Sequence, residues 1–183
     1  CKSAVPARRF LYYLPLAVLM TRNFWNGAAF NATLTEAVCY IICMLCVGFV
    51  EEVIFRGLLF RAMAEDNRNT AVVISSLTFG LGHLLNLVNG SGAGFAETLL
   101  QVAGAVALGF LFVILFDRGG SLLPCILAHA VINITSIFAN EMGLTLEKGM
   151  AMQLVLIAVA VAYALILTKT LPKNQHAKAH RQE

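Results

Sequence analysis

Residues 38–63 read VCYIICMLCVGFVEEVIFRGLLFRAM, a long apolar run whose middle holds two adjacent carboxylates, Glu51 and Glu52. Thr33 or Thr35 can cap a helix at the start of this run. A helix that spans a bilayer needs about 20 mostly apolar residues, so the run is long enough to cross one. It therefore predicts a membrane helix that carries two acidic side chains inside the bilayer.

The composition of the whole chain indicates a membrane protein. Hydrophobic residues make up 59% of the 183 positions, charged residues make up 13%, and the mean hydropathy is +0.78. Soluble globular chains carry nearer half apolar and a quarter charged residues. A soluble core could not bury so much apolar sequence, so the solvent of this chain is predicted to be lipid.

The rest of the sequence repeats this plan of apolar runs and polar joints. The further runs are too long and continuous for strands, so we interpret them as helices. They cover about residues 71–88, 95–116, 122–139 and 150–168. Residues 10–20 form a shorter run with Pro15, which fits either an interfacial helix or the end of a span. The prediction is an all-α, polytopic transmembrane helical bundle with an intramembrane polar cavity, in one domain over residues 1–183. The chain starts at Cys1 rather than Met, which fits a fragment that lacks earlier membrane helices.

Positive residues predict the orientation of the bundle. Arg61, Arg68, Arg118 and a basic C-terminal tail fall on one side, and the loop at 141–149 falls on the other. The positive residues of the tail are Lys169, Lys173, Lys178 and Arg181. Cytoplasmic loops are enriched in Lys and Arg, so the C-terminus is predicted to be cytoplasmic. A basic tail after an apolar segment is more typical of a cytoplasmic helix end than of a nucleic-acid site.

Glu51 and Glu52 are costly in lipid, which indicates a function. A charge at the centre of a membrane helix costs about 2.5–3.5 kcal/mol on insertion scales. Alternatively they mark the end of a short span over residues 36–50, but residues 53–60 are again apolar and too short to span alone. Arg56 follows Glu52 by four residues on the same helical face, so the two can pair. Glu51 points about 100° away on an α-helix and lacks that partner, which makes it the better candidate for an acid or base.

Two later helices carry polar side chains of a complementary kind. His83 lies in SSLTFGLGHLLNLVNG, with Phe79 four residues before it on the same face. His129 and Asn133 lie four residues apart in LPCILAHAVINI, again on one face. Polar groups on an apolar helix face a polar cavity rather than lipid. Hydrogen bonding between helices is the alternative role for each of them alone.

The depths of these residues predict one shared cavity. At a rise of 1.5 Å per residue, Glu51 lies about 20 Å from either end of its helix. By the same rise His83 lies about 18 Å, and His129 about 10 Å, from the cytoplasmic starts of their helices. Helix tilt brings these depths together. Two carboxylates, two imidazoles and an amide in one cavity can bind water, deprotonate it and stabilise an oxyanion.

Three short motifs occur in order within residues 36–140. EEVIFR (51–56) matches EExxxR, FGLGH (79–83) matches FxxxH, and HAVIN (129–133) matches HxxxN. Their order and spacing resemble the CAAX prenyl protease and bacteriocin-processing family of membrane proteins, called CPBP or Abi. The resemblance implies an intramembrane protease, and no motif position departs from the pattern.

The resemblance also implies a role for each motif residue. Glu51 and His83 would activate the attacking water, and His129 and Asn133 would form the oxyanion site. The supporting residues would be Glu52, Arg56 and Phe79. The family has been described both as glutamate-type proteases and as metalloproteases.

A bound zinc is an open alternative. Glu51, His83 and His129 could supply three ligands of a catalytic zinc with an open fourth position. The HExxH spacing that places two ligands on one helix is absent from the chain. The metal-free mechanism, with no cofactor, is therefore the preferred interpretation.

The predicted activity is hydrolysis of peptide bonds in membrane-associated peptides or proteins. Eukaryotic relatives remove the last three residues of prenylated CaaX proteins, whereas members of bacterial type resemble processing enzymes or immunity proteins for peptide bacteriocins. The short loops of this chain resemble the bacterial type, so a multi-pass protein of a bacterial cell membrane is expected. Its predicted partners are membrane lipid and a membrane-associated substrate, and no nucleic acid. The alternatives are a non-catalytic immunity or scaffold protein of the same fold and a proton-coupled transporter, because buried Glu and His also build proton relays.

Overall fold

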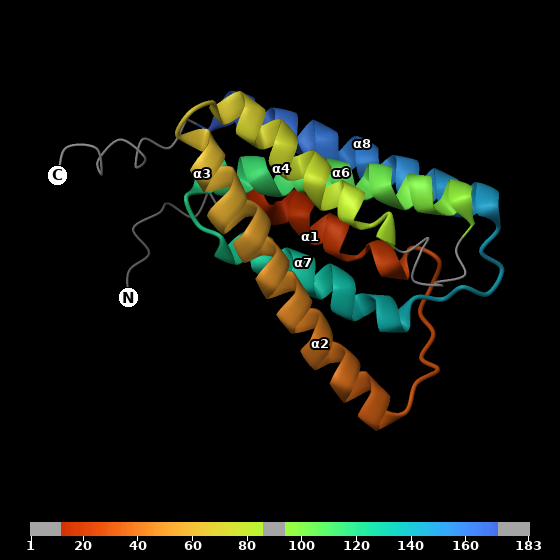
Figure 1. Ribbon diagram of the computed structural model, residues 1–183. Helices are drawn as coiled ribbons and strands as arrows, with labels where there is room; N and C mark the ends of the chain where they lie inside the picture. Colours follow the sequence, from red (N-terminus) through yellow and green to blue (C-terminus); the bar gives the residue numbers. More distant parts are fainter. Residues whose placement is uncertain (1–11, 86–93, 172–183) are drawn as a thin grey trace.

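The computed structural model describes residues 12–85 and 94–171, and these residues form helices joined by short connections (Figure 1). The elements in chain order are α1 (Leu14–Met20), the 3₁₀ helix η2 (Arg22–Phe24), α2 (Leu34–Glu52), the π-helix η3 (Val53–Phe60), α3 (Arg61–Ala64), α4 (Arg68–Gly82), α6 (Phe95–Gly119), α7 (Leu123–Thr135), the 3₁₀ helix η4 (Ser136–Phe138) and α8 (Leu146–Thr170). The all-α prediction is confirmed. The tail residues Lys173, Lys178 and Arg181 lie outside the described residues.

Among the described residues, three helices are long and apolar enough to cross a membrane. They are Leu34–Ala64, Phe95–Gly119 and Leu146–Thr170. The first is the continuous rod of α2, η3 and α3 that contains the two adjacent carboxylates. Large apolar side chains along this rod are exposed, among them Ile42 at 57% and Phe49 at 55%, as expected where lipid is the solvent. The chain is an integral membrane protein.

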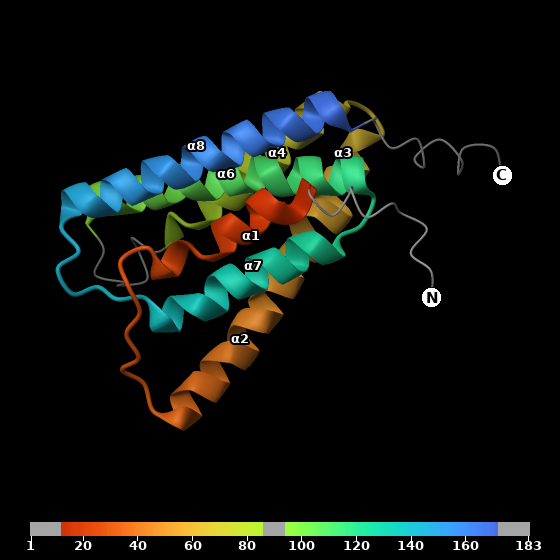
Figure 2. The same cartoon turned by 180° about the vertical axis from the view of Figure 1, so that it is seen from behind.

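The helix α6 is the centre of the bundle. It packs against α4 on one side and α8 on the other, and its residues from Leu111 to Asp117 are all buried. Below this layer lie α1 and α7, and α2 diverges from the rest of the molecule at its N-terminal end (Figures 1 and 2). Because α2 packs mainly on α7, its contact with α7 positions the two carboxylates.

The short N-terminal run forms α1, which is buried on one face and exposed at Leu14 and Val18. Pro15 lies in its first turn, where a missing N–H costs little. Leu16 and Leu19 are buried, and the helix packs against both α7 and α8. That α1 is either an interfacial helix or the end of a span stays a prediction, because residues 1–11 lie outside the described residues.

The helix α4 ends earlier than the sequence predicted. The apolar run reached residue 88, but α4 stops at Gly82 and His83 follows as its capping residue. Glycine is the weakest helix former after proline, and α4 has Gly80 and Gly82 in its last turn. With 15 residues the helix is about 22 Å long, shorter than the roughly 30 Å hydrocarbon core. His83 therefore lies at the end of a helix that is too short to span a bilayer alone.

Capping groups define the other helix ends. Thr33, not Thr35, caps α2, and it forms a reciprocal capping box with Glu36. Gly120 ends α6 in the left-handed region at φ 73°, a conformation that favours glycine. The start of α2 and the turn after α6 thus follow from local sequence chemistry.

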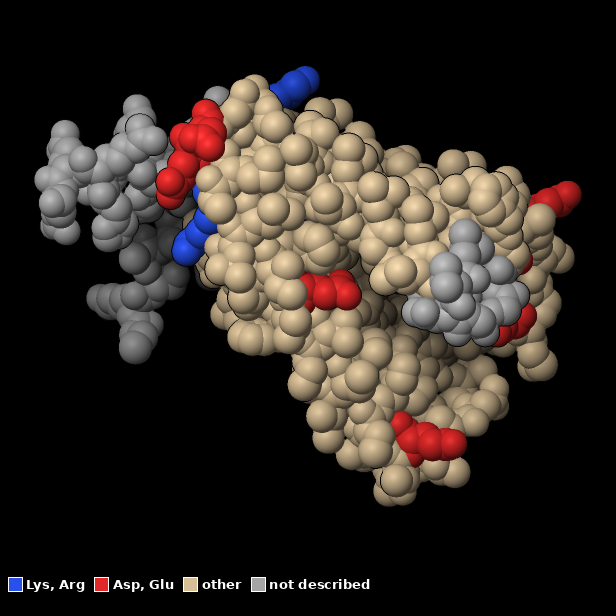
Figure 3. All heavy atoms as spheres, viewed as in Figure 1, with Lys and Arg blue, Asp and Glu red and all other residues tan. Residues whose placement is uncertain are grey.

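Arg61, Arg68 and Arg118, three of the positive residues that predict the orientation, lie at the α3–α4 end of the bundle, whereas Arg22 and Lys148 lie at the other end. Arg68 and Arg118 both form ion pairs with the buried carboxylate of Asp117. Arg118 also donates a hydrogen bond of 2.8 Å to the carbonyl oxygen of Leu171, at the end of α8. Figure 3 shows positive and acidic side chains near this α3–α4 end. That this end faces the cytoplasm stays a prediction.

Candidate active site

A close crossing of α2 and α7 brings the carboxylates to the first histidine. A Cβ atom at Gly48 would lie 3.0 Å from the backbone nitrogen of Ala130. Such a distance is shorter than real Cβ contacts allow without movement of the neighbour, so only glycine fits this approach unstrained. Ala130 follows His129, and Glu52 comes one turn after Gly48. The crossing therefore places the end of α2 beside His129.

Glu52, Arg56 and His129 form a buried network. Arg56 donates a hydrogen bond of 3.0 Å to Oε1 of Glu52, and both side chains are 0% exposed. The predicted pairing of these two residues is confirmed. The same carboxylate oxygen lies 2.9 Å from Nδ1 of His129. Buried charges are stable in proteins when they are paired and hydrogen-bonded. Glu52 and Arg56 are paired, but Oε2 of Glu52 and Nε of Arg56 have no hydrogen-bond partner among the described residues.

The guanidinium of Arg56 is held from two further directions. It donates a hydrogen bond of 3.2 Å to the carbonyl oxygen of Gly109 on α6. Its central carbon lies 4.2 Å from the ring centroid of Phe79, a cation–π contact. Arg56 therefore connects η3, α4 and α6, which supports the sequence interpretation of Glu52, Arg56 and Phe79 as a supporting group.

Glu51 occupies the other side of His129 and is accessible. Its Oε2 lies 3.7 Å from Nε2 of His129, an ion-pair distance that is too long for a hydrogen bond. The Glu51 side chain is 36% exposed, against 0% for Glu52. Acidic atoms are visible in the hollow between α2 and the body of the molecule (Figure 3). Of the two adjacent carboxylates, Glu51 is the one that a substrate or water can reach.

His83 faces the same group from the end of α4. Its Nδ1 lies 3.4 Å from the carbonyl oxygen of Phe79. A carbonyl oxygen can only accept, so in this contact Nδ1 carries the proton and Nε2 of the neutral ring keeps a lone pair. The charges of Glu51 and His129 both act on this ring. His83 is thus suited to accept a hydrogen bond from a water molecule.

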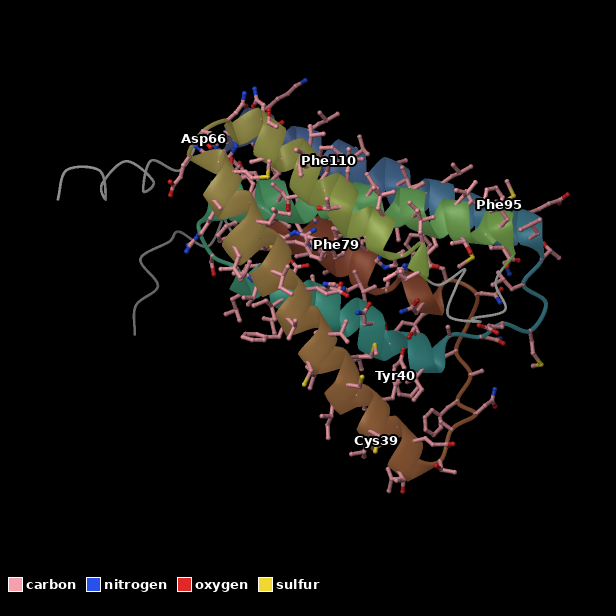
Figure 4. All side chains as sticks on the ribbon, viewed as in Figure 1. Cys39, Tyr40, Asp66, Phe79, Phe95 and Phe110 are labelled. Carbon is pink, nitrogen blue, oxygen red and sulfur yellow. The ribbon has the colours of Figure 1, made fainter. Side chains whose placement is uncertain are left out.

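Phe79 lies between the two imidazoles. Its ring centroid is 5.7 Å from that of His83 and 5.5 Å from that of His129, both in edge-to-face geometry. Figure 4 shows Phe79 near the middle of the molecule, with Asp66 at one end and Phe95 at the other. The residues from the three motifs therefore meet at mid-depth, as the sequence predicted.

The side chain of Asn133 forms no hydrogen bond or ion pair with this group among the described residues. Within residues 12–85 and 94–171, the contacts of Asn133 involve its carbonyl oxygen, which accepts from the hydroxyls of Tyr40 at 3.3 Å and Ser136 at 2.7 Å. Its side chain lies one turn from His129 on the same face of α7. The predicted role of Asn133 therefore rests on this position.

The segment after the carboxylates is a π-helix rather than the α-helix that the sequence predicted. It covers Val53–Phe60. Its geometry keeps Glu52 and Arg56 within hydrogen-bond distance, and the hydroxyl of Ser75 on α4 donates a 2.7 Å bond to the carbonyl oxygen of Phe55. π-Helical turns are rare and are found frequently at functional sites. The hydrophobic pattern of the sequence carries no signal for this change of helix type.

The presence or absence of a metal in the site stays a prediction, and the described residues show no assembled ligand group. Among the described residues, no three His, Cys, Asp or Glu side chains lie close enough together to hold a metal ion. Nδ1 of His129 is directed at Glu52, and its Nε2 is directed at Glu51. The zinc ligand set considered from the sequence, Glu51, His83 and His129, is not assembled as a ligand group in this arrangement.

Two features of the site were not predicted from the sequence. The contact between Glu52 and His129 joins residues 77 positions apart, and only their shared cost in an apolar helix hints at it. The second is Arg22 on η2, whose charge also acts on His83. Arg22 follows a short apolar run and belongs to no motif, so nothing in the pattern indicated that it folds back toward the site.

Comparison with known proteins gives one family. The family model described as type II CAAX prenyl endopeptidase Rce1-like matches residues 33–135. The matched residues include all three motifs and more than half of the chain. No curated protein and no solved structure matches the chain.

Proposed function

The chain belongs to the Rce1-like family of type II CAAX prenyl endopeptidases, and we propose that it hydrolyses peptide bonds of membrane-associated peptides or proteins by a water that Glu51 and His83 activate. The observation that carries this proposal is the contrast between two neighbouring carboxylates. Glu52 is fully buried and bonded, whereas Glu51 is 36% exposed beside two imidazoles. A general base must reach both water and substrate, and Glu51 meets that requirement.

The proposed first step is attack of water on the scissile carbonyl carbon. Glu51 accepts a proton from the water as its oxygen forms the new bond, and Nε2 of His83 accepts a hydrogen bond that orients the water. The carbonyl oxygen then carries a negative charge. Nε2–H of His129 and the side-chain amide of Asn133 would donate to this oxyanion. The C–N bond breaks as the proton held by Glu51 passes to the leaving amine.

The oxyanion role sets a condition on His129. Its Nδ1 and Nε2 are both directed at carboxylate oxygens. An imidazole can donate from both nitrogens only in its doubly protonated form. We therefore propose that His129 acts as an imidazolium, with Nδ1–H held by Glu52 and Nε2–H free to turn from Glu51 to the oxyanion.

The test is cleavage of a lipid-modified peptide by the purified protein in liposomes. We expect Glu51→Gln to lower turnover by about 10²–10⁴-fold, the usual contribution of a positioned acid or base. Glu65→Gln is the matched control, because Glu65 is exposed and follows the same rod of helices. Unchanged turnover in Glu51→Gln would reject Glu51 as the general base, whereas absence of turnover in the wild-type protein would reject proteolysis and favour a scaffold or immunity protein of this fold.

A second arm addresses the metal alternative. Wild-type protein treated with a strong zinc chelator should keep its full turnover, since the mechanism proposed above uses side chains and water only. Activity that is lost on chelation and restored by added zinc would contradict the metal-free mechanism while leaving the protease assignment intact.

A further inference from the structure

A cavity of about 240 Å³ lies apart from the candidate active site, at the end of the bundle where α6 and α8 begin. Its walls come from η2, the connection between α7 and α8, and the first turns of α8. Phe95, at the start of α6, marks this end of the molecule in Figure 4. The cavity shares no lining residue with the group around Glu51 and His129. Its lining is therefore distinct from that group, although the charge of Arg22 also acts on His83.

The cavity contains a guanidinium that has no anionic partner. Arg22 is half-buried there, and no described carboxylate forms an ion pair with it. Burial lowers the pKa of Arg22, because removal from water disfavours the charged form. A buried charge is stable when an opposite charge offsets its lost hydration, so the cavity is suited to an anion.

The orientation of Arg22 is fixed by its neighbours. Gln153 on α8 donates a 3.1 Å hydrogen bond to the carbonyl oxygen of Leu100, which leaves its own oxygen to accept from Arg22 at 3.3 Å. Next to Arg22, Asn23 donates bonds of 2.6 Å and 2.8 Å to Ile132 and Thr135 on α7. These bonds hold η2 between α7 and α8, so Arg22 is presented by a rigid frame.

The remaining lining combines polar and apolar groups in layers. The rim carries Asn26, Asn140, Glu141 and Leu144, and the apolar wall of Met152 and Leu156 lies further along α8. Gln153 lies seven residues after the start of α8, or about 10 Å into the helix. The rim is therefore near the headgroup layer and the apolar wall is near the acyl chains. Trp25 also lines the cavity, and tryptophan is enriched at this level of a bilayer.

We propose that this cavity binds one phospholipid, with the phosphodiester on Arg22 and the glycerol and upper acyl chain along the apolar wall. The charge of the guanidinium requires an anion, and its fork geometry suits a phosphate oxygen pair. The apolar wall distinguishes a lipid phosphate from a free phosphate ion, which would gain nothing from it. Basic pockets between membrane helices are a known form of lipid recognition.

The experiment measures lipid retention by native mass spectrometry after the protein is delipidated in a nonionic detergent. Dioleoylphosphatidylglycerol is the probe, dioleoylglycerol is the same lipid without phosphate, and inorganic phosphate is the headgroup alone. We expect one phosphatidylglycerol per chain and at least tenfold weaker binding of the other two. Arg22→Gln should weaken lipid binding at least tenfold, and Arg61→Gln, an exposed arginine on α3, should change it less than twofold.

A second variant keeps the test valid if Arg22→Gln folds poorly. Glu141 lines the cavity and is exposed on a loop, so its carboxylate would repel a phosphate. Glu141→Gln should therefore tighten lipid binding by about two- to fivefold. The proposal is overturned if Arg22→Gln or Glu141→Gln leaves lipid binding unchanged, or if dioleoylglycerol or inorganic phosphate binds as tightly as the phospholipid. The lipid proposal is also overturned if a peptide with a free C-terminal carboxylate competes with the lipid and the same peptide with a C-terminal amide does not. That result would make the cavity a binding site for the peptide substrate.

Discussion

Glu52 is the residue on which the site depends most, although it does not contact the substrate in the proposed mechanism. A single oxygen, Oε1, receives the hydrogen bond from Arg56 and contacts Nδ1 of His129. Its second oxygen has no partner among the described residues. Glu52 therefore acts as a positioning residue that couples the charge of Arg56 to the protonation of His129.

Glu52→Gln tests this coupling because glutamine keeps an acceptor at Oε1 but removes the charge. We expect turnover per folded molecule to fall about 10- to 100-fold, the equivalent of losing a charged hydrogen bond of roughly 1.5–3 kcal/mol. The ¹⁵N resonances of the His129 ring give the decisive readout. They should show both nitrogens protonated in the wild type and one in the variant, a change that a purely structural role would not produce. Identical His129 spectra in the two proteins would refute the coupling.

For the individual side chains of the candidate site, the sequence pointed to the residues but did not predict one of the contacts between them. The cost of charge in lipid pointed to Glu51 and Glu52, and the four-residue spacing predicted the bond to Arg56. The bond from Glu52 to His129 depends on how α2 crosses α7, and helical periodicity carries no information on the crossing of two helices. Exposure of Glu51 and burial of Glu52 follow from the same crossing.

Among the helices, the contact between α2 and α7 determines the geometry of the site. The closest approach is at Gly48, where α2 meets the backbone of Ala130. The rest of α2 is largely exposed to lipid, with only Ala37, Gly48 and Glu52 buried. Its position against the bundle thus depends on this close contact together with polar contacts, from the Tyr40 hydroxyl to Asn133 and from Glu52 to His129.

Gly48→Val should separate α2 from α7 and lower the activity. Added methyl groups at a tight contact cost about 1–3 kcal/mol through displaced neighbours, and the displacement would lengthen the contact between Glu52 and His129. Turnover and thermal unfolding in detergent are the measurements, and both should fall. Gly149→Ala is the control, because a Cβ at Gly149 on α8 meets no atom within 4 Å. Equal loss in the control would show that any glycine change on a membrane helix has this effect.

Two element boundaries were beyond prediction from the sequence for a shared reason. The apolar pattern continues past Glu52 and past Gly82, so it predicts uninterrupted α-helix in both places. The structure changes to a π-helix at Val53 and ends α4 at Gly82. Both interruptions occur beside the site, where Arg56 and His83 must face the same group. Hydropathy indicates which residues contact lipid, and the residues before and after each interruption are equally apolar. The apolar pattern therefore does not reveal where the helix changes or ends.

The whole bundle is closed at the end opposite the lipid cavity by a polar clamp around Asp117. This carboxylate is buried on α6 and pairs with Arg68 on α4 and with Arg118, whose guanidinium reaches the carbonyl oxygen of Leu171 after α8. The clamp therefore ties together the ends of the three helices that form the upper layer. The site lies well away from it, since Gly109, the α6 residue bonded to Arg56, precedes Asp117 by eight residues, or about 12 Å along the helix.

Asp117→Ala should accordingly reduce stability and spare catalysis. Removing the anion leaves two arginines without their partner, and the side chain of Arg68 is 32% exposed. Solvent screening of that charge lowers the expected loss to about 1–3 kcal/mol, below the 3–5 kcal/mol of a fully buried pair. Asp66→Ala, in the exposed turn before α4, is the control and should unfold like the wild type. Turnover per folded molecule should be unchanged in both variants. If fully folded Asp117→Ala turned over substrate more slowly than the wild type, the ion pairs of Asp117 would affect the geometry of the active site. Stability and catalysis would then not be separate properties of the two regions of the bundle.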